Sequence, residues 1–169
     1  MRVTLVGFMG CGKSTVAALL ARRLGWRLVE MDELILSNSG EESIEDIFQK
    51  RGEGYFRDLE CACLNSLSKE DKLVVSAGGG VVMRPENLDA LKAGGGKVVY
   101  LETGFEEVKK RLGDGRGRPL FQDVKQAENL YIFRVPLYKR FCDVKVKSED
   151  KTPEQVAQEI QVWLAQAGK

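Results

Sequence analysis

Residues 3–15, VTLVGFMGCGKST, decide the fold of this 169-residue chain. An apolar, β-branched run leads into a loop with Gly7, Gly12, Lys13 and Ser14 in the places of the pattern G-x-x-x-x-G-K-[ST], and a helical pattern follows. In such a unit the glycines let successive backbone N–H groups converge on phosphate oxygens, and the helix N-terminus favours negative charge. The stretch therefore predicts a nucleoside triphosphate site in which Lys13 neutralises the β- and γ-phosphates and Ser14 ligates Mg²⁺. The residues expected to bind the nucleotide here are Gly10, Cys11, Gly12, Lys13, Ser14 and Thr15.

The composition excludes several classes of function. The 26 basic and 25 acidic residues nearly cancel, so no overall field favours nucleic acid or an anionic membrane. No apolar run approaches the ~20 residues that span a bilayer, and the glycine loop comes too early for a signal sequence. The absence of histidine removes Ser-His-Asp and Cys-His hydrolases, and the four cysteines lack the CxxC spacing of zinc sites. We expect a cytoplasmic protein with no nucleic-acid or membrane partner and with free thiols.

One of these cysteines, Cys11, lies among the loop amides, which would stabilise a thiolate and make it sensitive to oxidation. The alternative, which we favour, is that Cys11 is a small residue whose side chain points away from the phosphates.

Short β-branched runs alternate with helical patterns along the chain. Strands separated by helices favour right-handed crossovers and a parallel sheet covered on both faces, so we expect one α/β domain over 1–169. The glycine-rich stretch GDGRGRPLFQD (113–123) fits no element and predicts a mobile loop. The expected strands are 3–7, 27–31, 72–77, 97–102 and 143–147, and the expected helices are 13–25, 33–38, 43–67 with a break near Gly52 and Gly54, 85–93, 104–112, 125–140 and 153–166.

Ligands of an open parallel sheet gather beyond the carboxyl ends of its strands. The triplet Gly78, Gly79 and Gly80 follows an expected strand, so its bare backbone can approach a polar substrate. The triplet at 94–96 and the sequence SKED at 68–71 precede their strands instead. We expect those two segments to be plain turns at the opposite edge.

Two carboxylates end the second expected strand. Strand alternation aims Glu30 and Asp32 the same way, toward the Mg²⁺ and phosphates. Asp32 is suited to accept or orient the proton of an attacking alcohol. The alternative is an N-cap role for Asp32 in a helix that begins near Glu33, and the two roles are compatible.

Four arginines are candidates for anion binding. A pair formed by Arg57 in GYFRDLE and Arg134 in FRVPLYKR would select an acceptor with a carboxylate, because the guanidinium fork matches that group; the alternative for each is a solvated helix face. Arg116 and Arg118 lie in the 113–123 loop, where a closing lid would exclude water and neutralise the transferring phosphoryl group. Arg118 is the stronger candidate, and a basic surface loop is the alternative.

The motifs GFMGCGKST, Asp32, FRDLE, SAGGGVV, RPLF and RVPLY occur in the order and spacing of the shikimate kinase family, which the chain resembles from about residue 3 to 166. The resemblance implies a three-layer P-loop kinase fold, like that of nucleoside monophosphate kinases, with a five-stranded parallel sheet and a lid at 113–123. It also implies ATP- and Mg²⁺-dependent phosphorylation of the 3-hydroxyl of shikimate, on the route to chorismate and aromatic amino acids.

Site roles follow from the same resemblance. It implies that Asp32 faces the shikimate hydroxyls, that Arg57 and Arg134 hold the carboxylate, and that Gly78 to Gly80 line the pocket. The catalytic residues would be Asp32, Lys13 and Arg118; Arg118 would also bind ATP, with Arg111 and Pro153 on either side of the adenine. We expect the enzyme to be a monomer.

The chain departs from the family at one point, because Glu30-Met31-Asp32 stands where Asp-x-Asp is usual. Glu30 is one methylene longer, and we expect it near a water bound to Mg²⁺. Two alternatives to a shikimate kinase remain. One is another small hydroxy-acid kinase such as gluconate kinase, and the other is a non-catalytic sensor that binds a nucleotide.

Overall fold

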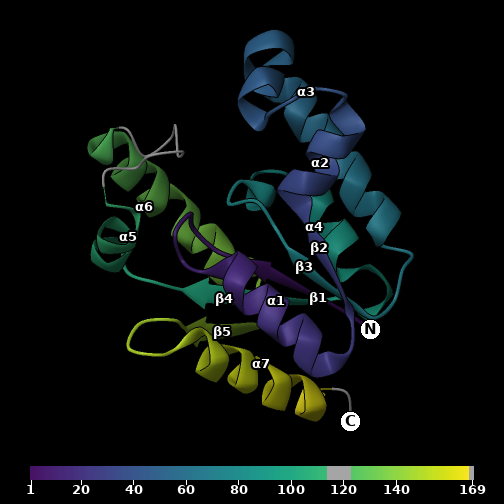
Figure 1. Ribbon diagram of the computed structural model, residues 1–169, viewed down its shortest axis with the longest axis vertical. Helices are drawn as coiled ribbons and strands as arrows, with labels where there is room; N and C mark the ends of the chain where they lie inside the picture. Colours follow the sequence, from purple (N-terminus) through teal and green to yellow (C-terminus); the bar gives the residue numbers. More distant parts are fainter. Residues whose placement is uncertain (114–122, 168–169) are drawn as a thin grey trace.

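The computed structural model describes residues 1–113 and 123–167 (Figure 1). Five parallel strands form one sheet in the order β2-β3-β1-β4-β5. The predicted lid residues 114–122, Arg116 and Arg118 among them, lie outside the described residues. The strands are β1 (Arg2–Val6), β2 (Arg27–Glu30), β3 (Leu73–Ser76), β4 (Lys97–Glu102) and β5 (Val144–Lys147). The helices are α1 (Lys13–Leu24), α2 (Met31–Ser39), α3 (Ile44–Leu67), α4 (Pro85–Lys92), α5 (Phe105–Leu112), α6 (Val124–Phe141) and α7 (Pro153–Ala167), with 3₁₀ turns at η1 (Val81–Met83) and η2 (Ala93–Gly95).

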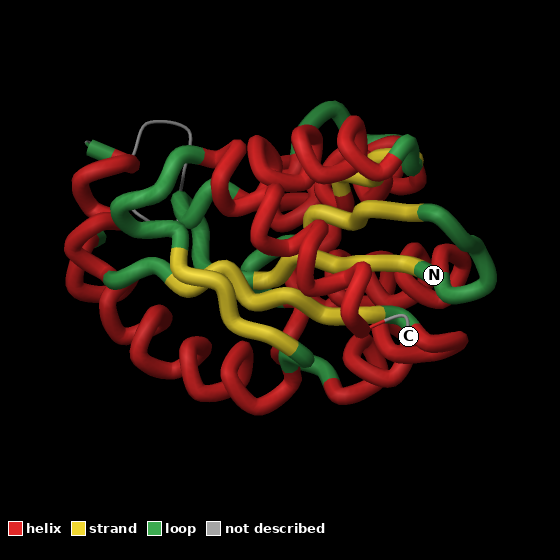
Figure 2. Tube along the Cα trace, turned by 90° about the horizontal axis from the view of Figure 1, so that it is seen from below, coloured by secondary structure: helices red, strands yellow, loops and turns green. Residues whose placement is uncertain are grey.

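Helices cover both faces of the sheet, which gives three layers (Figures 1 and 2). Along β4, Val98 and Tyr100 join the apolar cluster under α3, α4 and α6, whereas Val99 and Leu101 join the cluster under α1 and α7. All four side chains are buried, as expected of a parallel strand covered on both sides. This double burial explains why the strands read as continuous apolar runs. None of the described helices is long and apolar enough to cross a membrane.

Two helices differ in detail from the expected boundaries. The second helix was expected to start near Glu33, but α2 begins at Met31 and its N-cap is Glu30, without a side-chain capping bond. The N-cap alternative for Asp32 is therefore wrong, since Asp32 lies inside the first turn, where the helix dipole favours a carboxylate. Within α3 the break is at Gly52, whose φ of 82° lies in the left-handed region.

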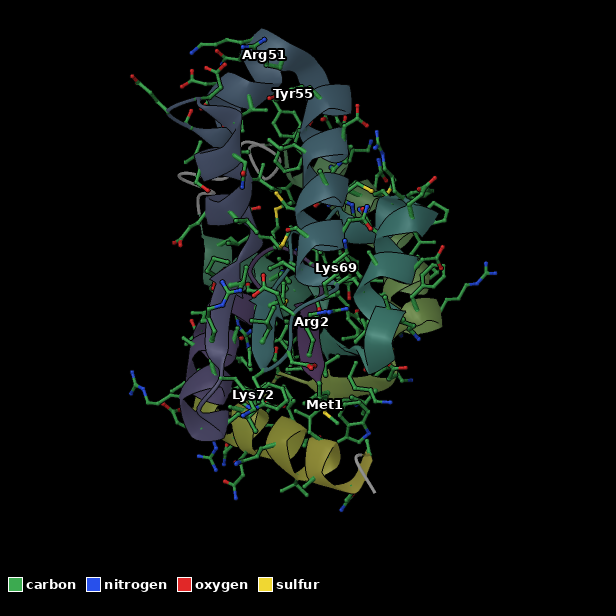
Figure 3. The ribbon with its side chains drawn as sticks, turned by 90° about the vertical axis from the view of Figure 1, so that its right-hand side faces the viewer. Met1, Arg2, Arg51, Tyr55, Lys69 and Lys72 are labelled. Carbon is green, nitrogen blue, oxygen red and sulfur yellow. The ribbon has the colours of Figure 1, made fainter. Side chains whose placement is uncertain are left out.

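Arg2 joins β1 to the ends of two helices (Figure 3). Its buried guanidinium donates to the carbonyl of Leu67 at the end of α3 and to those of Ala90, Leu91 and Ala93 at the end of α4. Burial lowers the pKa of Arg2. A cation that binds the last carbonyls of a helix is favourable, so Arg2 fixes both helices at the amino edge of the sheet.

Candidate active site

The loop between β1 and α1 has the backbone geometry of a phosphate cradle. Gly12, the N-cap of α1, has φ 92°, a conformation that favours glycine. A Cβ on Gly7 would lie 2.9 Å from the carbonyl oxygen of Leu101, so the loop passes too close to β4 for a larger residue. Lys13 Nζ donates to the carbonyls of Gly7 at 2.8 Å and Phe8 at 2.9 Å, which keeps the ammonium over the loop.

A cavity of about 280 Å³ opens beside this loop, at the carboxyl edge of the sheet. Its walls come from the loop, from the β2–α2 junction, from the end of β3 and from α5. Gly78 and Gly79 of the triplet after β3 line this cavity on the same side as the loop, whereas Gly94–Gly96 precede β4 in a turn. The lining residues are Met9, Gly10, Gly12, Lys13, Ser14, Thr15, Glu30, Asp32, Ser76, Ala77, Gly78, Gly79, Arg111 and Leu112.

Three oxygen-bearing side chains meet at one end of the cavity. Ser14 Oγ donates to Glu30 Oε2 at 3.2 Å and lies 3.5 Å from Ser76 Oγ. Hydroxyl and carboxylate oxygens are the donors that Mg²⁺ prefers, so this set fits the expected cation. In the described part of the chain no group of three or more His, Cys, Asp or Glu side chains could hold a metal ion by itself. A cation here would therefore depend on phosphate oxygens and water as well.

Arg57 and Arg134 come together on the glycine triplet. A Cβ on Gly80 would lie 2.5 Å from both Nη1 and Nη2 of Arg57, and a Cβ on Gly79 would lie 3.5 Å from Nη1 of Arg134. The Arg57 side chain is 11% exposed and Arg134 is 6% exposed, so the alternative of solvated helix faces is wrong for both. Burial lowers the pKa of Arg134. Two guanidinium groups therefore converge on glycine backbone that no side chain covers, an arrangement that can bind a carboxylate through charge-assisted hydrogen bonds.

Glu60 is a further site residue that the sequence motifs did not single out. Its carboxyl is 1% exposed, and Oε2 accepts from Arg57 Nη1 at 3.1 Å and from Asn87 Nδ2 at 3.4 Å. Oε1 is buried with no hydrogen-bond partner among the described residues. Burial raises the pKa of Glu60, and Arg57 opposes that rise. The i, i+3 spacing from Arg57 in FRDLE was the available signal.

The unpartnered oxygen of Glu60 lies close to the predicted catalytic carboxylate. A Cβ on Gly78 would lie 3.4 Å from both Glu60 Oε1 and Asp32 Oδ1. Asp32 itself is exposed and lines the cavity. Two carboxylates therefore flank Gly78, between the phosphate loop and the two arginines.

On its outer side Arg57 also binds a second acid. Its Nε and Nη2 donate to Glu53 Oε1 at 3.3 Å and 3.1 Å, and Glu53 follows directly after the break at Gly52. The ring of Phe56 lies 5.1 Å from the guanidinium carbon. Arg57 is thus held from three sides.

Of the two residues expected at the adenine, only Arg111 lines the cavity. Its Nη1 donates to the carbonyl of Cys11 at 3.3 Å and its Nη2 to that of Ser148 at 3.0 Å, while Nε pairs with Glu107. Pro153 begins α7 and is not among the lining residues. The Cys11 side chain is 1% exposed and packs in the apolar cluster under α1, as the favoured interpretation predicts.

Comparisons with known proteins agree on one family. The model of the family described as "Shikimate kinase" matches residues 9–165. The curated shikimate kinase of Persephonella marina is 40% identical over 159 residues, which cover 94% of this chain and 95% of that protein. Among solved structures, shikimate kinase from Acinetobacter baumannii in complex with shikimate has a TM-score of 0.90 and 34% identity, covering 99% of this chain and 95% of that one. Shikimate kinase from Aquifex aeolicus has a TM-score of 0.87 and 39% identity, covering 99% and 98%.

Proposed function

The chain belongs to the shikimate kinase family, and we propose from this premise that its cavity is where ATP phosphorylates the 3-hydroxyl of shikimate. The protein is an enzyme with the P-loop kinase fold, it phosphorylates shikimate, and ATP is its co-substrate. The reaction is a step in the biosynthesis of chorismate and the aromatic amino acids.

One observation carries the assignment to this cavity. Asp32, Gly78 and Gly79 line the same space as Lys13 and Ser14, so a group held at the glycine triplet lies next to the phosphate loop. In-line phosphoryl transfer needs little more from the protein than this positioning together with neutralisation of charge.

The proposed roles follow from the charges around the cavity. Lys13 and the loop amides hold the β- and γ-phosphates, and Arg57 with Arg134 holds the carboxylate of shikimate against Gly79 and Gly80. Asp32 orients the attacking hydroxyl and accepts its proton.

On the nucleotide side we propose a role for Arg111 at the adenine, with Pro153 beside it. Arg118 is proposed as the lid arginine and lies outside the described residues.

Mg²⁺ is part of the proposal. Ser14 would hold it directly and Glu30 through a water molecule, a choice supported by the oxygen donors that meet at this end of the cavity. When bound, the ion would neutralise charge on the phosphates.

The decisive experiment is a coupled assay of ADP release with and without shikimate. We expect ADP release that depends on shikimate. Strong activity with gluconate and none with shikimate would favour the other hydroxy-acid kinase, and tight ATP binding with no ADP release would favour a nucleotide sensor. The family match favours neither alternative.

The role of Asp32 has its own test. Asp32→Asn should lower kcat by at least about 100-fold, the usual contribution of a positioned base. The KM for ATP should stay within about twofold, because Asp32 is assigned to the acceptor. Unchanged turnover in the same assay would reject this role.

We also propose that residues 1–169 act as a single domain, as a monomer and in the cytoplasm. The single five-stranded sheet, to which all the described strands belong, supports the first of these.

A further inference from the structure

Tyr138, the last residue of the RVPLY motif, has no role in the function proposed above. It lies four residues after Arg134, so the two side chains leave the same face of α6. Tyr138 is 0% exposed, and its ring stacks on Tyr100 of β4 with centroids 5.2 Å apart. Its hydroxyl donates to the carbonyl oxygen of Gly79. The helix that carries Arg134 is thereby tied to the glycine triplet.

Gly79 is enclosed by α6 on one side and by the phosphate loop on the other. A Cβ at this position would lie 3.5 Å from the Tyr138 hydroxyl, from Arg134 Nη1 and from the carbonyl oxygen of Gly7. The turn that follows is fixed by hydrogen bonds from Val81 N to the Gly78 carbonyl at 3.1 Å and from Met83 N to the Gly80 carbonyl at 3.0 Å. The Gly79–Gly80 peptide plane can still rotate, because glycine backbone dihedral angles are only weakly restricted.

The bond from Tyr138 fixes that rotation. The Gly79–Gly80 peptide is trans, as there are no cis peptide bonds in the described chain, so its N–H points to the opposite side from its carbonyl. With the Gly79 carbonyl held by Tyr138, the N–H of Gly80 is directed away from α6. Gly80 is also the residue against which the end of the Arg57 guanidinium lies.

We propose that Tyr138 is a positioning residue for the acceptor: by holding the Gly79 carbonyl, it aims the Gly80 N–H at the carboxylate that Arg57 and Arg134 grip. This inference rests on the proposed acceptor site. Tyr138 is fully buried, and its hydroxyl acts through the Gly79–Gly80 peptide while also lying beside the Arg134 guanidinium. Burial raises the pKa of Tyr138 far above its usual value, so the hydroxyl remains a donor throughout the working pH range.

The variant Tyr138→Phe removes one oxygen atom and keeps the stacked ring. We expect the KM for shikimate to rise about three- to tenfold, the usual effect of losing one hydrogen bond. The KM for ATP should stay within about twofold, since the nucleotide is bound by other residues. If Tyr138 only stabilised the fold, the variant would change the KM for shikimate and the KM for ATP together, or would change neither.

Tyr131→Phe is the matched control. Tyr131 also lies on α6, and its hydroxyl also donates to a backbone carbonyl, that of Thr103 at 2.9 Å, outside the glycine triplet. This variant should lose comparable stability and keep the wild-type KM for shikimate. Thermal unfolding of both variants separates loss of stability from loss of acceptor binding.

A rescue experiment keeps the inference testable if the phenylalanine variant folds poorly. Incorporating 4-aminophenylalanine at position 138 retains an N–H donor and should restore the KM for shikimate to within about twofold of wild type. The inference is overturned if Tyr138→Phe leaves this KM unchanged, or if the amino variant folds but does not restore it. If the wild-type protein itself releases no ADP with shikimate, the proposed function fails instead, so the two failures are distinguishable.

Discussion

The variant Gly80→Ala tests whether the guanidinium of Arg57 packs directly against the glycine triplet. The φ of −91° and ψ of −1° at Gly80 suit alanine, so the backbone is not strained by the change. The added Cβ would nevertheless lie 2.5 Å from Nη1 and Nη2 and 2.7 Å from Cζ of Arg57. Because the clash is with the far end of a side chain, the protein should fold and the guanidinium should move.

The size of that movement sets the expected effect. To restore ordinary contact at 3.4 Å, the guanidinium must retreat by about 0.9 Å. Its hydrogen bonds to Glu60 and Glu53 are 3.1 Å long, so a shift of this size breaks or bends them. The displaced guanidinium would also lose its proposed hydrogen bond to the carboxylate of shikimate, and loss of a hydrogen bond to a charged group costs about 1.5–3 kcal/mol. The KM for shikimate should therefore rise by roughly 10- to 160-fold.

The assay is coupled ADP release over a range of shikimate concentrations, with the KM for ATP measured in parallel. Gly54→Ala is the matched control, because Gly54 lies on the same helix as Arg57, its φ is not positive, and a Cβ there meets nothing within 4 Å. It should leave both KM values unchanged and raise stability by about 0.5–1 kcal/mol. A KM for shikimate within twofold of wild type in Gly80→Ala would refute the reasoning.

Two further predictions concern the carboxylates. Glu30→Gln should raise the Mg²⁺ concentration for half-maximal activity by about tenfold, with the KM for shikimate unchanged; a Mg²⁺ titration that overlays the wild type would contradict this. Burial raises the pKa of Glu60, so the folded state binds its proton more tightly than the unfolded chain, whose reference pKa is 4.5. As the pH rises from 4.5 through the raised pKa, the unfolding free energy of the wild type should then fall relative to that of Glu60→Gln. Urea denaturation of both proteins at a series of pH values measures this difference. Unfolding free energies that follow parallel curves against pH would argue against it.

Much of the fold could be predicted because its signals are local. The glycine loop requires a strand before it and a helix after it, and the apolar runs such as KVVYLE at 97–102 are buried on both faces in β4. The start of α2 could not be predicted, because Glu30 caps the helix through its backbone alone and leaves no capping motif in the sequence.

The site was predictable where position along a strand decides it. Asp32 and Gly78 follow strands, and the rule of carboxyl ends brings both to the cavity. Glu60 follows no strand, and its signal was the i, i+3 spacing from Arg57. Tyr138 has no such signal, since its role depends on a partner far away in the sequence. Tyr138 meets a carbonyl 59 residues earlier, and only the packing of α6 against η1 creates that contact.

The longer carboxylate at position 30 is compatible with a cation beside Ser14. A serine hydroxyl has one proton and two lone pairs, and in this chain the proton goes to Glu30 Oε2 at 3.2 Å. An aspartate would be shorter by about 1.5 Å, one carbon–carbon bond, and would leave a gap that a water molecule can fill. Glu30 instead accepts the hydrogen bond of Ser14 Oγ directly, which leaves the lone pairs of that oxygen available to a cation. The proposed role of Ser14 as a Mg²⁺ ligand is therefore compatible with the longer Glu30, and replacing Glu30 should weaken the response to the metal without affecting the acceptor.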